Sequence, residues 1–408
     1  MRTLIAVSLL IFLLPALSRA DFTHIARAKN LSKIEIKTDD DVPTIASIKY
    51  IPKQIWLISA SENLVCVWDM RTFEQKKRFY DKSFGKINAI CADADAKFAY
   101  FCTGEPGKIG KLFKLDLQSG EHKIIFETAD EIFAIAYSPA NKRIAAGALN
   151  GELIVINCED DSIIFKAKDE NEKIVSLDFN EQGTFLAVAY ASGRICARAE
   201  EDSYKTPAAN FSARCVPVGL KFIPRSEKDI AVVAGYGTDS KILIFRNFQE
   251  RLSREFRTPD FNASAFYARN MAHQFIIAGK DGNLAAYKSR PDEPEFFEAV
   301  NTRLESADRG AQNNVIAAGA NGVIYAWQNF NGILIGGIVL QSADGADYAV
   351  WTSPGHAYAT KENSIRFFNK NDKVIKDYTQ FFDRKKVEDF LRTKNETQKP
   401  KTKADAEK

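Results

Sequence analysis

The chain has 408 residues, of which 45% are hydrophobic and 27% are charged, so it carries enough apolar side chains for a large core. Its 56 basic and 53 acidic residues leave a formal net charge of +3. This near balance argues against a nucleic-acid-binding protein, which should show a basic stripe or face. The length allows several ordinary domains or one closed all-β repeat fold.

The first twenty residues have the pattern of a secretory signal. Arg2 supplies a positive start, Leu4 to Leu17 is an almost unbroken apolar run, and Ser18 and Ala20 are small residues placed for cleavage after Ala20. The apolar run of ~14 residues is shorter than the ~20 that a membrane-spanning helix needs. We therefore expect a signal peptide over residues 1–20 and no transmembrane segment in the mature chain.

The expected compartment is the bacterial periplasm, with secretion as the alternative. No cysteine follows the apolar run, which disfavours a lipid anchor. Asn-x-Ser/Thr sequons occur at Asn30, Asn210, Asn262 and Asn395. We expect Asn262 to lie in an innermost strand, where a glycan has no room, and this favours a bacterial over a eukaryotic export route.

From Thr44 onward one pattern recurs: an apolar residue, a second apolar residue three positions on, an aromatic or small residue, and often a proline. It occurs as Ile45, Ile48, Tyr50 and Pro52. Copies start near residues 45, 87, 132, 174, 217, 261, 301 and 347, at intervals of 40 to 46 residues. A repeat of this length, built from short strands, is typical of β-propeller blades.

The third unit shows how one repeat is organised. Its expected strands are Ile132–Ser138, Arg143–Ala148, Glu152–Asn157 and Ser162–Ala167, and Asn150-Gly151 is a turn suited to positive φ. Second strands in most units are small and apolar, which lets neighbouring sheets approach closely. No long amphipathic helical run occurs before residue 383, so the pattern predicts an all-β fold.

The predicted architecture is a β-propeller over residues 21–382 with eight four-stranded blades. The alternative is seven blades, with residues 347–382 forming a C-terminal cap. Ser32–Lys37 alternates apolar and polar residues and is expected to close the ring by supplying the missing edge of the last blade. Residues 383–394 are expected to form a short helix docked through Val387, Phe390 and Leu391. Residues 395–408 lack large aliphatic side chains and are expected to be disordered.

These units resemble the WD40-repeat family. The third strand of unit 1 ends in Val67-Trp68-Asp69, at the family's Trp-Asp position. Unit 7 has Tyr325-Ala326-Trp327, followed by Gln328 in place of the acid. The family's Gly-His pair and its buried Asp are absent, so hydrophobic packing is expected to hold the blades. The last unit, with Trp351–Gly355 and Tyr358–Thr360, resembles the C-terminal segment of some bacterial WD40 proteins.

The sequence does not predict an enzyme, a metal site or a bound cofactor. Four histidines are spread over distant units, and no nucleophile, zinc-protease or phosphate-loop motif is present. The cysteines form no CxxC pair and are interpreted mainly as small buried residues. Cys91 and Cys102 are expected on paired strands, about two residues out of register. The six cysteines are Cys66, Cys91, Cys102, Cys158, Cys196 and Cys215.

One surface feature suggests a binding site for a cationic partner. Loops that enter the innermost strands should share a face with the Asn-Gly turns, and the loops before units 1, 3 and 4 are acidic. They would form an acidic arc over the ring, although solvated loops of ordinary composition are the alternative interpretation. The candidate partner-binding residues are Asp39, Asp40, Asp41, Asp130, Glu131, Asp169, Glu170 and Glu172.

Two functions follow as hypotheses. The first is a monomeric, non-enzymatic propeller that serves as a protein-interaction platform or accessory factor of a periplasmic or envelope complex, with protein partners and no nucleic acid. The second is a propeller that binds or hydrolyses a small ligand at its central channel, as a lactonase does. The second hypothesis requires polar residues from several blades to meet on the channel axis.

Overall fold

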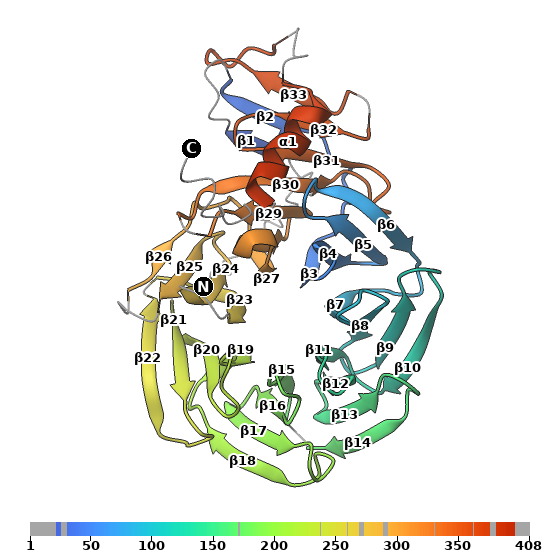
Figure 1. The fold of residues 1–408 in the computed structure, drawn as a ribbon, viewed down its shortest axis with the longest axis vertical. Coiled ribbons are helices and arrows are strands. Elements are labelled where there is room, and N and C mark those ends of the chain that lie inside the picture. Colours follow the sequence, from blue (N-terminus) through green and yellow to red (C-terminus); the bar gives the residue numbers. More distant parts are fainter. Residues whose placement is uncertain are drawn as a thin grey trace, which may run out of the picture.

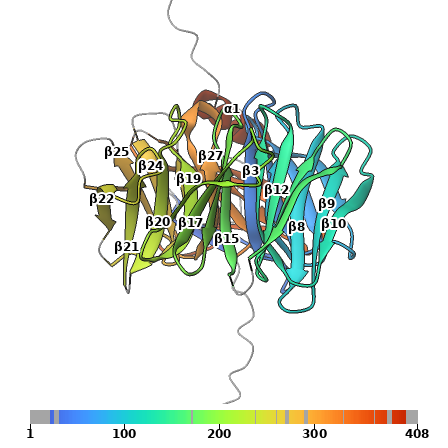
Figure 2. The same cartoon turned by 90° about the horizontal axis from the view of Figure 1, so that it is seen from below.

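The computed structural model describes residues 22–25, 31–169, 172–236, 238–258, 260–268, 273–288, 293–329, 331–361, 363–375 and 381–395. The predicted signal peptide and the tail from residue 396 lie outside these ranges. Within them the chain is built almost entirely of β-strands, arranged as antiparallel sheets around a ring (Figure 1). Seen from the side, the ring is a disc, and the strands of the blades run between its two faces (Figure 2).

Seven consecutive repeat units form the blades of the ring. Blade 1 contains β3 (Ile45–Ile51), β4 (Trp56–Ser61), β5 (Leu64–Asp69) and β6 (Glu74–Tyr80). Blade 2 contains β7 (Ile87–Ala92), β8 (Phe98–Glu105), β9 (Ile109–Asp116) and β10 (His122–Thr128). Blade 3 contains β11 (Ile132–Ser138), β12 (Arg143–Ala148), β13 (Glu152–Asn157) and β14 (Ile163–Lys168). Blade 4 contains β15 (Ile174–Phe179), β16 (Phe185–Tyr190), β17 (Arg194–Ala199) and β18 (Pro207–Ser212).

The remaining blades follow the same order, from the innermost strand to the outermost. Blade 5 contains β19 (Val216–Phe222), β20 (Ile230–Tyr236), β21 (Asp239–Phe245) and β22 (Leu252–Thr258). Blade 6 contains β23 (Ala263–Ala268), β24 (His273–Gly279), β25 (Leu284–Lys288) and β26 (Glu295–Phe296). Blade 7 contains β27 (Leu304–Arg309), the 3₁₀ turn η1 (Ala311–Asn313), β28 (Val315–Gly319), β29 (Val323–Trp327) and β30 (Leu334–Leu340).

The ring closes between blade 7 and blade 1. Each innermost strand contacts the innermost strand of the next blade, and β27 contacts β3. Two hydrogen bonds join these strands: Ile48 N–H donates to Ser306 Oγ at 3.2 Å, and Tyr50 N–H donates to an Asp308 carboxylate oxygen at 2.9 Å. Blades 1 and 7 exchange no strand with each other. The closure therefore depends on side chains packed across the seam between them.

The eighth unit forms a β-sheet, as the repeat count predicts, but it lies outside the ring. β31 (Tyr348–Thr352) and β32 (Ala357–Ala359) extend the sheet of blade 7 beyond β30. β33 (Ile365–Phe368) pairs with β2 (Lys33–Ile36), which pairs with β1 (Phe22–Ile25). The ring itself has seven blades with a C-terminal cap, which is the alternative arrangement given above, and the eighth unit is present as additional sheet. The physical reason is that β27 and β3 already contact each other and leave no gap in the ring.

The sequence of strand β30 indicates that the sheet of blade 7 continues beyond this strand. The outer strands β6, β10 and β22 hold charged residues and are largely exposed or half-buried, whereas β30 is LIGGIVL and buried along its whole length. A strand with no polar side chain is suited to the middle of a sheet and not to its edge. Gly336 is required by β31, because a Cβ there would lie 2.3 Å from the carbonyl oxygen of Trp351.

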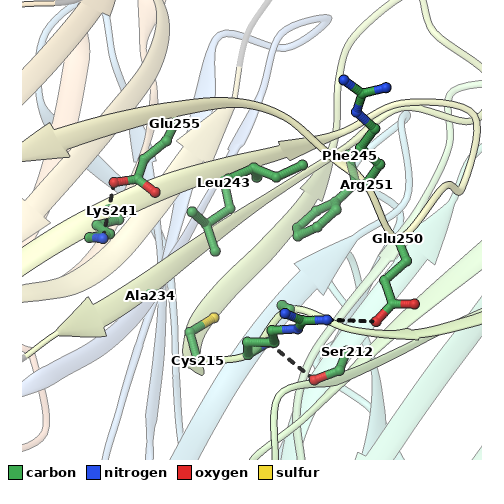
Figure 3. A pocket seen from close by; sticks show the side chains of 12 residues that line it. Ser212, Cys215, Ala234, Lys241, Leu243, Phe245, Glu250, Arg251 and Glu255 are labelled. Atoms are coloured by element: carbon green, nitrogen blue, oxygen red, sulfur yellow. Dashed lines mark hydrogen bonds and ion pairs between the residues drawn. The ribbon is translucent and has the colours of Figure 1, made fainter.

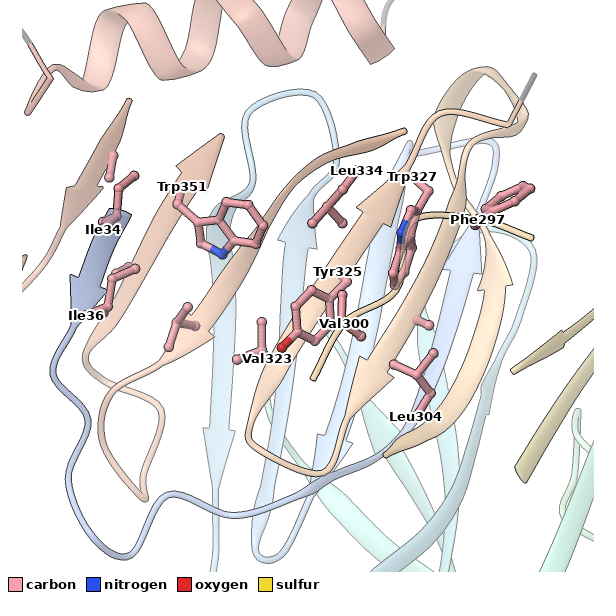
Figure 4. Packing of buried hydrophobic residues seen from close by; sticks show 14 of the residues in the cluster. Ile34, Ile36, Phe297, Val300, Leu304, Val323, Tyr325, Trp327, Leu334 and Trp351 are labelled. Carbon is pink, nitrogen blue, oxygen red and sulfur yellow. The ribbon is translucent and has the colours of Figure 1, made fainter. Parts of the chain in front are cut away.

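The cap packs its apolar side chains against blade 7. Ile34 and Ile36 on β2 are fully buried in one cluster with Tyr325, Trp327 and Trp351 (Figure 4). β2 has the alternating burial expected of SKIEIK and pairs with β33, so its predicted pairing with the last unit is confirmed. Its predicted role in ring closure is wrong, because the ring closes where β27 contacts β3. The ring of Phe22, on β1, lies 5.4 Å from that of Trp351, which fastens the N-terminal strand to the same cluster.

Helix α1 (Arg384–Asn395) covers the seam where the ring closes. Val387 and Leu391 are fully buried in a cluster that contains residues of blade 1, of blade 7 and of β31, as the predicted helix requires. Arg384 bridges to Glu74 of blade 1 at 2.9 Å. Beside the helix, the ring of Tyr348 on β31 meets that of Trp68 edge-on at 5.2 Å. Together, α1 and β31 hold blade 1 against blade 7.

The Trp-Asp position of blade 1 is stabilised by polar contacts. Trp68 Nε1 donates to Ser59 Oγ at 2.8 Å, and the Asp69 carboxylate accepts from Arg71 Nε at 2.9 Å and from Arg71 Nη2 at 2.8 Å. Burial raises the pKa of Asp69, but the hydrogen bonds from Arg71 outweigh it, so the pKa is lowered below 3.8. Blades 2, 3, 5 and 6 have Phe113, Ile156, Phe245 and Tyr287 at this position, all buried.

We expect Asp69→Asn to reduce stability more at neutral pH than in acid. A carboxylate whose pKa is lowered by folding stabilises the protein above its unfolded pKa, and that contribution is lost as pH falls through the folded pKa. Loss of the charged hydrogen bonds should lower the free energy of unfolding by about 1–3 kcal/mol at pH 7. Urea unfolding at pH 7 and pH 3 measures the difference, with Asp40→Asn, at an exposed position, as control. An equal loss at both pH values would contradict this assignment.

The structure confirms the expected register of Cys91 and Cys102 but not the expected place of Asn262. Cys91 pairs with Tyr100 and Cys102 with Ala89, so the two thiols are two positions out of register, as predicted. All six cysteines are unpaired, and only Cys215 is not buried. The expectation for Asn262 is wrong: it precedes β23 and is exposed, because the innermost strand of blade 6 starts one residue later. The argument from Asn262 against glycosylation therefore does not hold.

Candidate binding sites on the propeller

The acidic loops share a face with the turns between second and third strands, as predicted. Asp39, before blade 1, forms an ion pair with Lys361 at 2.6 Å, while Asp40 and Asp41 are exposed. Before blade 3, Asp130 accepts from the backbone N–H of Gly107, in the β8–β9 turn, at 2.6 Å. These contacts fasten the loops to neighbouring turns.

The other candidate carboxylates are also engaged within the protein. Glu131 is buried and accepts from Asn88 Nδ2 at 2.8 Å. Asp169 accepts from Tyr190 Oη at 2.7 Å and from Arg194 Nη2 at 2.6 Å, and Glu172 lies 3.5 Å from Arg194 Nε. Burial raises the pKa of Asp169, but the hydrogen bonds from Arg194 and Tyr190 lower it by more. Glu170 lies outside the described residues. Only Asp40 and Asp41 of the described set are exposed, so binding by the arc stays a prediction that this geometry does not favour.

The same face carries exposed apolar side chains that the sequence did not single out. Phe133, in the bulge at the start of β11, is 45% exposed, and Val216, the first residue of β19, is 63% exposed. Both lie where innermost strands begin, at the rim of the channel. Ile109, 38% exposed, starts β9 beside the Asp130 loop. Large exposed apolar patches mark interaction sites, so these side chains are the candidates on this face for contact with a partner.

The central channel is a cavity of about 810 Å³ lined by innermost strands and by the turns that follow them. Asp178 of blade 4 accepts from Phe222 N–H of blade 5 at 2.8 Å, as Asp308 does from Tyr50 N–H of blade 1. Ser176 accepts from Leu220 N–H at 3.0 Å, in the position that Ser306 has in blade 7. These Ser-x-Asp pairs satisfy backbone donors of the neighbouring inner strand, and a repeated S-x-D in units 4 and 7 is the sequence signal for them.

Each of these Asp residues also meets a lysine in the channel. Lys221 Nζ donates to Asp178 at 2.9 Å, and Lys49 Nζ lies 3.3 Å from Asp308. Burial lowers the pKa of Lys221, but Asp178, with a smaller contribution from Asp308, raises it above its usual value. Lys221 therefore stays an ammonium at neutral pH. Tyr267 of blade 6 lines the same cavity.

A second, smaller cavity of about 420 Å³ lies on the flank of blades 4 and 5 (Figure 3). Its floor is apolar, with Leu243 and Phe245, and its rim carries two ion pairs, Lys241–Glu255 at 3.0 Å and Arg214–Glu250 at 3.8 Å. Cys215 lines it, and burial raises the pKa of its thiol to about 11. A thiol with this pKa is almost fully protonated at neutral pH, which makes it a poor nucleophile.

Among the described residues, no three His, Cys, Asp or Glu side chains are grouped so that they could hold a metal ion. No helix in the described part of the chain is long and apolar enough to cross a membrane.

Comparison with known families agrees with the fold. The family model of the anaphase-promoting complex subunit 4 WD40 domain matches residues 135–206, which run from β11 of blade 3 to the residue before β18 of blade 4. The match and the repeated four-stranded sheets together fit a WD40-like β-propeller. Comparison with curated proteins gave no match. Such a propeller is, in general, suited to serve as a platform for protein interactions.

Proposed function

We propose that this WD40-like propeller is a monomeric, non-enzymatic platform that binds a protein partner in the periplasm or cell envelope. The observation that carries the proposal is the apolar rim, defined by Ile109, Phe133 and Val216, on the face that also holds the acidic loops. Burying an exposed Phe or Val side chain contributes about 1.5–3 kcal/mol when its full surface is removed from water. Asp40 and Asp41, exposed on the same face, add negative charge for a partner with basic residues around an apolar centre.

The test is partner retention by rim variants. Affinity capture from a periplasmic extract, with mass-spectrometric identification, defines the partner. Phe133→Ser and Val216→Ser are each expected to weaken its binding at least tenfold, because each removes an exposed apolar contact. Ile163→Ser is the matched control, since Ile163 is 51% exposed but lies on the outer strand β14. Full retention by both rim variants would exclude the rim as the binding surface.

Export is tested separately from binding. The proposed cleavage after Ala20 leaves Asp21 as the new N-terminus, one residue before β1. Cell fractionation and N-terminal sequencing of the full chain should find the protein in the periplasm beginning at Asp21. Removal of residues 2–20 should retain it in the cytoplasm. A protein found in the cytoplasm with its N-terminal residues intact would contradict export and leave the platform proposal untouched.

A second candidate function is small-ligand binding in the central channel. It is favoured by one observation: charged side chains from blades 1, 4, 5 and 7 line a single cavity. Several charged side chains that line one cavity support this function. Native mass spectrometry of the gently purified protein tests it, and a co-purifying small molecule would support it over the platform alone.

A further inference from the structure

The two Asp–Lys pairs of the channel occupy equivalent places in the repeat. Asp178 and Asp308 each lie two residues after the residue that follows the bulge of an innermost strand, and Lys221 and Lys49 hold that place in the following blades. One pair joins blades 4 and 5, and the other joins blades 7 and 1. In a ring of seven blades the pairs are three blades apart one way and four the other. They therefore face each other across the channel.

The two Asp–Lys pairs define a layer of the channel. The carboxylates in this layer are occupied by contacts that hold the ring together. Asp178 accepts from Phe222 N–H and from Lys221, and Asp308 accepts from the N–H groups of Tyr50 and Arg309. Two other acids line the cavity and also accept from backbone: Asp93 from Lys97 and Phe98, and Glu181 from Arg225. Most of the acceptor capacity in the channel is thus used within the protein.

The donors in this layer retain capacity. A lysine ammonium has three N–H groups, and Lys221 uses one at 2.9 Å on Asp178, while Lys49 contacts Asp308 at 3.3 Å. Their side chains are 37% and 43% exposed, although both line the cavity. Arg309, the last residue of β27, is exposed in the same lining. Among the charged groups described for the channel, the hydrogen-bonding capacity that is left over is therefore mainly that of the cationic donors.

Small side chains of blades 2 and 3 leave room for a ligand in the channel. Blades 2 and 3 place Cys91 and Ala136 where blades 1 and 5 place lysines, and Ala89, two residues before Cys91, lines the same cavity. A volume of about 810 Å³ is within the range of cavities that hold small organic molecules.

We propose that this channel layer binds a small ligand through an oxyanion, a phosphate or a carboxylate, held between the ammonium groups of Lys49 and Lys221. The inference rests on the second candidate function and names its ligand class. The cavity lining carries three cationic side chains, Lys49, Lys221 and Arg309, against the four carboxylates named above. The channel therefore does not attract an anion at long range, and short hydrogen bonds provide the binding. Bare phosphate should accordingly bind with a dissociation constant of about 10⁻⁴ to 10⁻³ M.

The experiment is isothermal titration of the folded, full-length mature protein with inorganic phosphate and, separately, with succinate, at low ionic strength. Lys49→Gln and Lys221→Gln are each expected to weaken binding of the preferred probe at least tenfold. Lys241→Gln is the matched control: Lys241 is ion-paired at 3.0 Å, but in the flank cavity. Circular dichroism and gel filtration verify that each variant is folded.

Asp178→Asn supplies a readout that a structural role would not produce. The amide oxygen can still accept from Phe222 N–H, while the charge that competes for Lys221 is removed. Oxyanion binding should therefore tighten several-fold even if the variant is less stable. Unchanged affinity in both lysine variants, or weaker binding in Asp178→Asn, would overturn the proposal. A neutral or cationic molecule found in native mass spectrometry would overturn the oxyanion class alone, and absence of any bound molecule or probe would also remove the ligand-binding function.

Discussion

Replacing Leu391 by Asp is expected to lower the free energy of unfolding by about 3–5 kcal/mol and to open the ring between blades 7 and 1. Leu391 is fully buried in the cluster that α1 shares with both blades. The substitution removes apolar contacts and places a carboxylate where no water reaches it. Because blades 1 and 7 exchange no strand, no continuous backbone ladder compensates for the loss.

Urea unfolding followed by tryptophan fluorescence measures the effect, and Trp68 is a suitable reporter because it lies in the same cluster. Hydrogen exchange should show faster exchange in β3 and β6 than in the blades opposite the seam. Lys385→Asp is the control for adding a charge to the helix, since Lys385 is exposed. If Leu391→Asp unfolds no more easily than Lys385→Asp, α1 does not stabilise the closure.

Gly151→Ala is expected to be more damaging than any other single-methyl addition in the turns of blades 2 and 3. Gly151 has φ +83°, and a Cβ there would lie 1.9 Å from the carbonyl oxygen of Asp169. The left-handed conformation alone disfavours an L-residue by about 1–2 kcal/mol. The backbone clash forces the loop before blade 4 away from the turn, so we expect a total loss of at least about 3 kcal/mol and little soluble protein.

The matched control is Gly107→Ala in the corresponding turn of blade 2. Gly107 has φ +68°, but its Cβ would meet no atom within 4 Å. This variant should therefore show only the conformational penalty of about 1–2 kcal/mol. Soluble yield and urea midpoints of the two variants separate backbone strain from close packing. Equal losses would mean that the contact with the Asp169 loop is easily relaxed.

Local pattern was sufficient to predict the blades. In unit 3, three of the strands have the predicted bounds, and the fourth, Ile163–Lys168, is shifted by one residue from Ser162–Ala167. The strong alternation, the small residues of Arg143–Ala148 and the Asn150-Gly151 turn all specify the same hairpin. Gly151 adopts the positive φ that the turn predicts. Where several local signals agree in this way, tertiary context changes only the edges of an element.

The blade count and the site depended on contacts between distant residues. The eighth unit has the same repeat pattern as the others, and only the apolar outer strand β30 distinguishes blade 7 as a sheet with a further neighbour. The acidic loops were read as surface charge because the sequence does not show that Arg194 reaches Asp169. The channel lysines were missed because their partners, Asp178 and Asp308, belong to preceding blades around the ring. Such pairings become visible only when the order of blades in space is known.

The pairing of β2 with β33 has a consequence for the order in which the molecule forms. Lys33 is paired with Phe368, so a strand near the N-terminus has no partner until almost the whole chain is available. Contacts between residues so far apart in sequence form slowly, because a long loop must be closed before they contribute. Blades 1 to 6 can form from local hairpins as the chain emerges. The β2–β33 pairing comes last, so folding intermediates that lack it leave the apolar cluster around Trp351 without Ile34 and Ile36 and are the species most exposed to aggregation.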